Sequence, residues 1–377
     1  MTDPVVRAVF ARDEVARYLA GSHGVSGDEA RAKVEAYLDE LRTTQRYELY
    51  RALEYPLYPI LRKLDRYDEH IGIAKDVVAS GRRVVYASNH RSHMDYLLEL
   101  LALDDAGLRP PVIAAGINLF GGPLGLIQRH VVGALPIRRN TKDPAYHITL
   151  KAYVAELLRT QDFFFYPEGG RSYSGEIKSP KTGLLTACLQ AGLPELVVVP
   201  VSIAYDLVLE DHVLARQKVK RAQRAFSREV AEMVRYAVGY RSRAFVTFGP
   251  PVEVGGFNAE SRTSVLELGH HLMRVIGRQV KVLPTALMAS ALGPSMSDTE
   301  LLDAIAARLD VLKAGGANLE LTEAPAVMAA AAGRLEDRGI ITRDDGRFRV
   351  RDRNLLRYYA RGIEHLLPAA TPAPATV

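Results

Sequence analysis

The segment Arg83–Leu97, RVVYASNHRSHMDYL, decides the predicted fold. Its first six residues form a β-branched and aromatic run that is typical of a buried strand. The residues that follow include two histidines, an arginine and an aspartate, and they lead into an amphipathic segment. A strand that ends in a polar loop and continues as a helix is characteristic of α/β proteins. We therefore expect these polar residues at the end of a strand, where such sheets bind ligands.

The same alternation continues through the middle of the chain. Further strand-like runs are GALPI, DFFFYP, LVVVPVSIAY and RAFVTFGPP, and helical patterns such as 144–160 and 183–191 lie between most of them. We predict an α/β fold in which a mixed central sheet is covered by helices on its faces. The polar motifs of the chain fall on the loops that leave these strands.

Four regions are predicted along the chain. Residues 1–75 are expected to be helical, with a capping box formed by Ser26 and Glu29. The α/β catalytic domain is placed at 76–290, and a mainly helical C-terminal domain at 291–367. That domain opens at a second capping box and contains a hairpin that turns on Asp345 and Gly346. Residues 368–377 are a low-complexity tail that we expect to be disordered.

Charge and cysteine content restrict the possible partners. The net charge of +5 is too mild to argue for nucleic acid, but it fits an acidic substrate or an anionic membrane surface. The basic run 216–243 is expected to be either a solvated helix face or a docking surface for an acidic carrier protein, coenzyme A phosphates or lipid headgroups. The uncharged run 110–128 contains too many Gly and Pro residues for a membrane-spanning helix. A single cysteine, Cys188, indicates a reducing compartment and an inert core thiol.

Three interpretations of NHRSHMDYL are open from the residues themselves. Asp95, in the first turn of the following helix, can reach back to one nitrogen of His90 and leave the other free to take a proton. This is the base-and-orienter pair of a catalytic triad without its serine, so the nucleophile would be a substrate hydroxyl. A metal site would use His90, His93 and Asp95, but no second cluster of ligand residues lies nearby. A polar turn is the third interpretation.

Basic residues after two other strands favour catalysis. Arg138 and Arg139 follow GALPI, and the motif EGGRS follows DFFFYP. The two glycines of that motif allow close approach of the backbone to a ligand, and an arginine fork grips an anion. Its members are Glu168, Gly169, Gly170, Arg171 and Ser172, and Lys181 adds a further cation nearby. Together these residues predict a pocket for a phosphorylated alcohol.

Four blocks in order give a family resemblance. NHRSHMDY, GALPIRR, FYPEGGRSYSG with SPKTG, and VVVPVSIAYD cover Ser88 to about Asp206. With these blocks the chain resembles bacterial membrane-associated glycerol-3-phosphate 1-O-acyltransferases, within the glycerolipid acyltransferase family that carries the H-x-x-x-x-D motif. EGGRS and the full HRSHMDY favour this branch over the lysophosphatidate branch. The pattern HRSHMD alone is a weak indicator of the family, whereas the four blocks in this order are a specific one.

The resemblance implies an activity and a set of roles. His90 would deprotonate the 1-hydroxyl of glycerol-3-phosphate, and Asp95 would orient the imidazole. Arg139 and Arg171 would bind the phosphate with Arg138 and Lys181 behind them, while Glu168 and Gly169 would shape the pocket. The acyl donor would be acyl-CoA or acyl carrier protein, the product lysophosphatidate, and no metal or cofactor is expected. We expect a peripheral protein on the cytoplasmic face of the cell membrane.

Other functions are weighed against this one. Dihydroxyacetone phosphate and lysophosphatidate are alternative acceptors for the same chemistry. A non-catalytic lipid-binding or nucleic-acid-binding protein is a further alternative, because two helices and a hairpin at the C-terminus also outline a winged helix. Binding alone would not require a base and its orienter at a fixed spacing, so the enzymatic interpretation is preferred and nucleic acid is not an expected partner.

Overall fold

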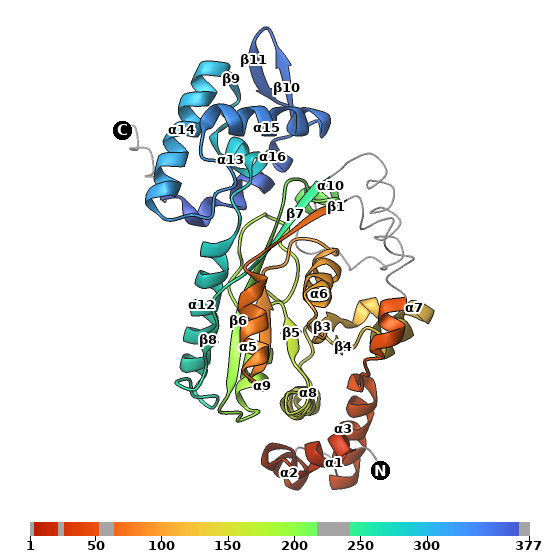
Figure 1. Cartoon of the computed structure of the whole chain (residues 1–377). Coiled ribbons are helices and arrows are strands. Elements are labelled where there is room, and N and C mark those ends of the chain that lie inside the picture. The colour runs from red at the N-terminus through yellow and green to blue at the C-terminus, as the bar shows by residue number, and fades with distance from the viewer. Residues whose placement is uncertain (1–3, 22–25, 53–63, 217–241, 369–377) are drawn as a thin grey trace, which may run out of the picture.

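The computed structural model describes residues 4–21, 26–52, 64–216 and 242–368 (Figure 1). A mixed eight-stranded sheet forms its centre, with strands in the order β1-β7-β6-β2-β5-β3-β4, and β8 pairs with β6. The strands that the sequence predicted are β2 (Arg83–Ser88), β4 (Ala134–Ile137), β5 (Phe163–Phe165), β6 (Leu196–Tyr205) and β7 (Ser242–Phe248). The predicted fold class, a mixed sheet with flanking helices, is confirmed.

Three strands of the central sheet were missed by sequence pattern. β1 (Leu64–Glu69) carries mostly charged residues, and it pairs in parallel with β7. β3 (Val112–Gly116) lies in the uncharged run 110–128 and pairs in parallel with β4 and β5. β8 (Val252–Glu253) is only two residues long. Because β1 lies within the region predicted as helical, the N-terminal part of the chain also contributes to the sheet. The domain boundaries themselves remain predictions.

The parallel strands determine where the functional loops meet. β2 is parallel to β5 and β6, and β3 is parallel to β4 and β5. The carboxyl ends of these strands therefore share one edge of the sheet. The loop with His90 follows β2, the loop with Arg139 follows β4, and the loop with Glu168 follows β5. The antiparallel pairing of β6 with β7 makes the sheet mixed.

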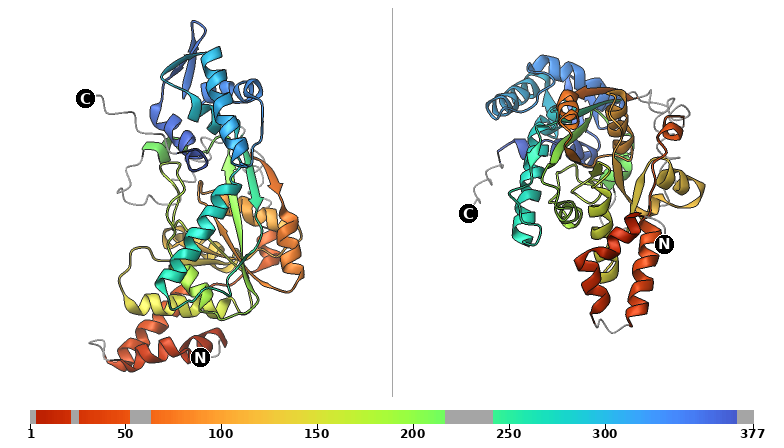
Figure 2. Two further views of the ribbon diagram at one scale, coloured as in Figure 1. Left: turned by 90° about the vertical axis from the view of Figure 1, so that its left-hand side faces the viewer. Right: turned by 60° about the horizontal axis from the view of Figure 1, so that its bottom comes forward.

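Helices cover both faces of the sheet (Figures 1 and 2). α5 (Ile71–Ala79) and α6 (Asp95–Asp105) pack on one face. α8 (Pro144–Leu157), α9 (Gly183–Leu189) and α12 (Arg262–Gln279) pack on the other. Alternate residues of β2 point into these two cores, with Val84 and Tyr86 on the first side and Val85 and Ala87 on the second. This alternation is the period of two expected for a strand buried on both faces.

The two ends of the chain add helices at opposite ends of the molecule (Figure 1). α1 (Pro4–Ala11), α2 (Asp13–Ala20) and α3 (Gly27–Leu41) pack against α8. The C-terminal part contains α13 (Pro284–Ala291), α14 (Asp298–Ala314), α15 (Ala324–Asp337), α16 (Arg353–Arg361) and the short η2 (Glu364–Leu366). A small antiparallel sheet of β9 (Ser295–Ser297), β10 (Ile341–Asp344) and β11 (Arg347–Val350) completes it.

Local signals in the sequence explain several of these boundaries. Ser297 and Glu300 form the full predicted capping box, which satisfies the first amides of α14. The hairpin between β10 and β11 turns on Asp345 and Gly346, both with positive φ, as tight hairpin turns require. At Ser26 the side chain accepts a hydrogen bond from the Glu29 amide, as predicted for the start of α3.

Some predicted features are placed differently or lie outside the described residues. The run 110–128 contains β3, the turn η1 (Ile117–Leu119) and most of α7 (Gly122–His130). In the described parts of the chain, no helix has the length and apolar character needed to cross a membrane. Nearly all of the basic run 216–243 and the tail 369–377 lie outside the described residues. At the start of that run, α10 (Asp211–Arg216) packs against α16.

Candidate active site

His90 and Asp95 form the predicted pair. His90 follows β2, and Asp95 is the first residue of α6, so the loop between them brings the two side chains together. His90 Nδ1 lies 2.8 Å from Asp95 Oδ2. An ionised carboxylate can only accept hydrogen bonds, so Nδ1 carries the proton and Nε2 is left with its lone pair. The His90 side chain is 13% exposed whereas Asp95 is fully buried, so a substrate can reach only the imidazole.

The carboxylate of Asp95 is held by four donors. Besides His90, the backbone amides of Arg91 and Ser92 donate to Oδ2, at 2.6 and 2.9 Å. The Tyr205 hydroxyl at the end of β6 donates to Oδ1 at 2.7 Å. Desolvation raises the pKa of Asp95 to about 6, and the hydrogen bonds from Ser92, Tyr205 and Arg91 oppose this rise. Asp95 is therefore ionised at neutral pH and fixed in one orientation.

The imidazole of His90 is neutral at neutral pH. Burial is the main cause that holds the pKa of His90 well below its ordinary value. The positive charge of Arg171 acts in the same direction, followed by His93, Arg139 and Lys178. A neutral imidazole with a free nitrogen is the form that accepts a proton.

Glu168 connects the His90 loop to the loop after β5. Its Oε1 accepts a hydrogen bond from the His90 amide at 2.9 Å, and its Oε2 accepts one from the Lys178 amide at 3.2 Å. The Ser172 amide donates in turn to the His90 carbonyl at 2.9 Å, and the Ser172 hydroxyl donates to the Glu176 carbonyl. Glu168 and Ser172 thus hold the two loops together. They do not point to solvent, as residues that bind a substrate would.

An aromatic ring covers one face of the imidazole. The rings of His90 and Tyr166 are stacked, with centroids 4.1 Å apart and planes 12° apart. The Tyr166 hydroxyl donates to Glu99 Oε2 at 2.7 Å, and Ser88 donates to the other oxygen of Glu99. Glu99 is fully buried on α6, one turn after Asp95.

Basic side chains gather beside His90. The guanidinium of Arg139 lies against two glycines, because a Cβ added to Gly116 or Gly170 would stand 3.2 or 3.5 Å from its nitrogens. The stem of Lys181 lies over Gly169, where an added Cβ would stand 2.5 Å from Lys181 Cδ. Gly169 also has a φ of +66°, which favours glycine. We call Arg139, Arg171, Lys178 and Lys181 the cation cluster.

Two members of the cation cluster, Lys178 and Arg171, are held in place by contacts with neighbouring groups. Lys178 donates to the carbonyls of Gly170 and Arg171, and burial lowers its pKa while the nearby Lys181 and Arg139 lower it further. Arg171 lies 3.5 Å from Glu210 and over the ring of Tyr173. An anion placed among these four cations would relieve their mutual repulsion.

Arg138 does not join the cation cluster. Its guanidinium forms a two-pronged ion pair with Glu40 of α3 and lies over the rings of Tyr37 and Tyr146. Its side chain is 42% exposed, compared with 10% for Arg171. Arg138 is thus directed toward the N-terminal helices, whereas Arg139 lies against the glycines beside His90.

Sequence patterns missed several residues of the site. Glu210 accepts from both the Ser92 hydroxyl and the His93 amide, which ties the loop after β6 to the start of α6. Lys178, Tyr166 and Glu99 were also missed. Lys178 stands just before the SPKTG block, so a search for further cations near that block would have found it. Nothing in the sequence reveals that Glu210, far along the chain, meets Ser92.

The alternative of a metal site gains no support in the described part of the chain, where no group of three or more His, Cys, Asp or Glu side chains is arranged to hold a metal ion. His93 uses its amide to bind Glu210, and the His90 ring is engaged by Asp95. Cys188 is buried in α9, and desolvation raises the pKa of its thiol far above its ordinary value. A thiol in that state is a poor nucleophile.

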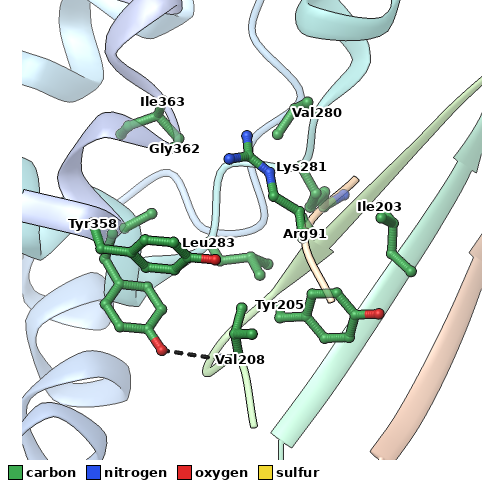
Figure 3. A pocket seen from close by; sticks show the side chains of 13 residues that line it. Arg91, Ile203, Tyr205, Val208, Val280, Lys281, Leu283, Tyr358, Gly362 and Ile363 are labelled. Carbon is green, nitrogen blue, oxygen red and sulfur yellow. Dashed lines mark hydrogen bonds between the residues drawn. The ribbon is translucent and has the colours of Figure 1, made fainter. Parts of the chain in front are cut away.

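A small cavity lies behind the pair, between β6 and the C-terminal helices (Figure 3). Its volume of about 50 Å³ is large enough for a few water molecules. Arg91 and Tyr205, which both hold Asp95, line it together with Tyr358 of α16. Tyr359, the next residue, accepts a hydrogen bond from the Val208 amide. The C-terminal helix α16 therefore packs directly behind the residues that position Asp95.

Comparisons with known proteins identify the central region. Residues 71–204 match the model of the family described as Acyltransferase. A protein from Aeromonas hydrophila named glycerol-3-phosphate acyltransferase is 36% identical over 247 residues, which cover 63% of this chain and 30% of that protein. A protein of the same name from Pasteurella multocida is 30% identical over 384 residues, covering 92% of this chain and 47% of that protein. This chain thus spans less than half the length of these relatives.

One solved structure is similar over much of the chain. It is the crystal structure of the 1-acyl-sn-glycerophosphate (LPA) acyltransferase PlsC from Thermotoga maritima, which is 16% identical in sequence. The match covers 72% of this chain and 84% of that chain, with a TM-score of 0.32.

Proposed function

Since residues 71–204 match the model of the family described as Acyltransferase, we propose that this chain transfers an acyl group to the 1-hydroxyl of glycerol-3-phosphate. The product is lysophosphatidate, and the donor is the thioester of acyl-CoA or acyl carrier protein. The observation that carries this proposal is the position of the His90–Asp95 pair directly beside the cation cluster. The names of the relatives support the choice of acceptor.

The reaction follows from the protonation states of the pair. His90 Nε2 takes the proton of the substrate hydroxyl as its oxygen attacks the thioester carbonyl. Asp95 stabilises the resulting imidazolium through Nδ1. The tetrahedral intermediate then collapses, the carbon–sulfur bond breaks, and the departing thiolate takes the proton from His90. These steps balance without an enzyme nucleophile, a metal or a cofactor.

The phosphate of the acceptor is bound by the cation cluster. Arg139 and Arg171 offer guanidinium forks, and Lys178 and Lys181 add point charges close to the two glycines of the EGG segment. Binding of the phosphate at this place holds the hydroxyl at the other end of the small substrate near His90. The enzyme works at the cytoplasmic face of the cell membrane as a peripheral protein, because its acyl products are amphiphilic.

Product analysis tests the proposal. The purified chain is incubated with glycerol-3-phosphate, dihydroxyacetone phosphate or lysophosphatidate, each with acyl-CoA and with acyl carrier protein, and products are identified by mass spectrometry. We expect acylation of glycerol-3-phosphate at its 1-hydroxyl. Acylation of lysophosphatidate alone would contradict the proposal.

The variant His90→Ala tests the role of His90 as the general base. Turnover should fall by a factor of about 10² to 10⁴, the usual contribution of a general base. His147→Ala is the control, because that imidazole lies on the surface of α8 and bonds only the nearby Thr141 carbonyl among its described contacts. Survival of full activity in His90→Ala would remove His90 from the reaction.

A further inference from the structure

Tyr166 lies in contact with the proposed base, and Glu99 lies in contact with Tyr166, but neither takes part in the chemistry described above. Three of the four restraints on His90 act on its backbone or on one ring nitrogen: Glu168 holds its amide, Ser172 holds its carbonyl, and Asp95 holds Nδ1. A single hydrogen bond at Nδ1 leaves the imidazole free to tilt about that contact. The stacked ring of Tyr166 is the fourth restraint, and it acts on the plane of the imidazole.

We propose that Tyr166 is a positioning residue that fixes the plane of the His90 ring, and that Glu99 acts through Tyr166 by holding its hydroxyl. This inference rests on the proposed role of His90 and extends it to two residues that touch neither acceptor nor donor. The near-parallel stack of the two rings, at 4.1 Å and 12°, keeps Nε2 pointed at the substrate. Small errors in the direction of a base cost large factors in rate.

The surroundings of Tyr166 explain why it is itself fixed. Its hydroxyl donates to Glu99, and the second oxygen of Glu99 accepts from Ser88, the last residue of β2. The Phe164 ring packs edge-on against Tyr166, at 5.5 Å between centroids. The ring is thus anchored to two strands of the sheet and to α6, which are rigid supports for a site.

The buried position of Glu99 favours its neutral acid form. Desolvation is the main cause that raises the pKa of Glu99 well above its ordinary value, and the charge of the nearby Asp95 raises it further. A protonated Glu99 does not compete with Asp95 for the positive charge that forms on His90. The amide of glutamine has the same shape and keeps an acceptor for Tyr166, so Glu99→Gln should preserve the arrangement.

Kinetics of three variants separate positioning from plain packing. Tyr166→Ala should lower kcat about 10- to 100-fold, while KM for glycerol-3-phosphate changes less than about threefold because the cation cluster is untouched. Tyr166→Phe keeps the stacked ring but loses the hydroxyl that Glu99 holds, so its kcat should lie between those of Tyr166→Ala and the unaltered protein, and Glu99→Gln should behave like the unaltered protein. Tyr96→Phe is the control, because Tyr96 lies on α6 like Glu99 but its hydroxyl contacts Gln128 of α7.

The pH dependence gives a second readout. Tyr166→Ala admits water to the imidazole, so the pKa of His90 should rise toward that of an ordinary histidine, and the acid limb of kcat/KM should move to higher pH. A purely structural loss would lower the amount of active protein without moving this limb. The titratable and charged groups that also act on His90 are unchanged in these variants: Asp95, Glu168, Arg171, His93, Arg139 and Lys178.

Titration of His90 by ¹⁵N NMR keeps the test independent of turnover. In the unaltered protein Nδ1 should carry the proton and Nε2 should not, and the titration should fall below that of an ordinary histidine. Tyr166→Ala should shift the titration upward, and Tyr166→Phe should not. If the chain makes no acylated product but His90 shifts in this way, the proposed function fails and the positioning stands. If kcat, acid limb and titration are all unchanged in Tyr166→Ala, the positioning role is refuted.

Discussion

Arg138 and Arg139 are adjacent in the chain but serve opposite sides of the molecule. Arg139 packs against Gly170 in the cation cluster, whereas Arg138 pairs with Glu40 and ties the N-terminal helices to the strand β4. The sequence offered both as phosphate ligands because they share a residue type and follow one strand. Which of the two faces the pocket depends on the path of the loop after β4, which the residue types do not specify.

This neighbouring pair makes a matched experiment. Arg139→Ala should raise KM for glycerol-3-phosphate at least about tenfold, because a charge-assisted contact to phosphate is lost. KM for the acyl donor should change much less. Arg138→Ala should leave both KM values near those of the unaltered protein and affect stability only slightly, since its ion pair is at the surface. Steady-state kinetics decide, and equal effects of the two changes would contradict the placement of Arg139 beside the phosphate.

A contact within one motif could be predicted from its spacing, whereas contacts between segments far apart in the chain could not. The contact of His90 with Asp95 follows from a spacing of five across a strand-to-helix loop, which is a local property. Tyr205 at the end of β6 and Glu210 in the loop after it reach the same site from more than a hundred residues later in the chain. Their roles depend on the order of strands in the sheet, which a single sequence does not specify.

Gly175 joins three elements at one point. Its carbonyl accepts a hydrogen bond from the Arg91 guanidinium, and a Cβ added to it would stand 1.9 Å from the carbonyl oxygen of Tyr358 in α16. Its φ of +85° is also one that glycine adopts readily and other residues do not. The loop after β5 can therefore pack closely against α16 because Gly175 has no side chain.

Substitution at Gly175 should show this fit. Gly175→Ala combines backbone strain with a clash against main-chain atoms and should cost at least about 3 kcal/mol of unfolding free energy. Gly192→Ala is the control, because its φ of +63° is similar but no atom lies within 4 Å of the added Cβ. That change should cost about 1 to 2 kcal/mol. Chemical denaturation measures both, and equal losses would show that contact with α16 does not matter.

Strands were predicted correctly where their side chains form an apolar run. β2 and β6 are buried on both sides and read as continuous apolar runs. β1 reads LDRYDE, and it is a strand because its backbone pairs with β7, while Glu69 is bound by Lys281, Asn318 and Thr247. Tertiary pairing overrides a poor local propensity there, so that strand was not predictable from its own residues.

Two hydrophobic cores connect the regions that were predicted separately from the sequence. One core contains Val84 and Phe164 of the sheet together with Leu301, Leu335 and Leu355 of the C-terminal helices. The other joins the opposite face of the sheet to the N-terminal helices α1 to α3. Buried ion pairs reinforce the first connection, where Arg338 of the C-terminal part binds Asp211 at the start of α10. These regions are therefore expected to fold as one unit.

Thermal unfolding should reflect this shared core. We expect a single transition by calorimetry that coincides with the loss of circular dichroism. Leu335→Ala, which empties a buried site in α15, should lower the whole transition by a cost of about 2 to 5 kcal/mol and should not create a second one. Val311→Ala, at a partly exposed position on α14, is the control and should have little effect. Two separate transitions in the unaltered protein would mean that the C-terminal part folds independently.

The pairing of β1 with β7 also determines the order of events during synthesis. The two strands are parallel neighbours although Glu69 and Thr247 are separated by 178 residues. At ordinary rates of translation, β1 is synthesised about 10 to 35 s before β7. Over that interval the nascent chain carries a strand without its partner, and such a segment is open to chaperones or to pairing with other chains. Substitutions in β1 should therefore first lower the yield of folded protein from the cell.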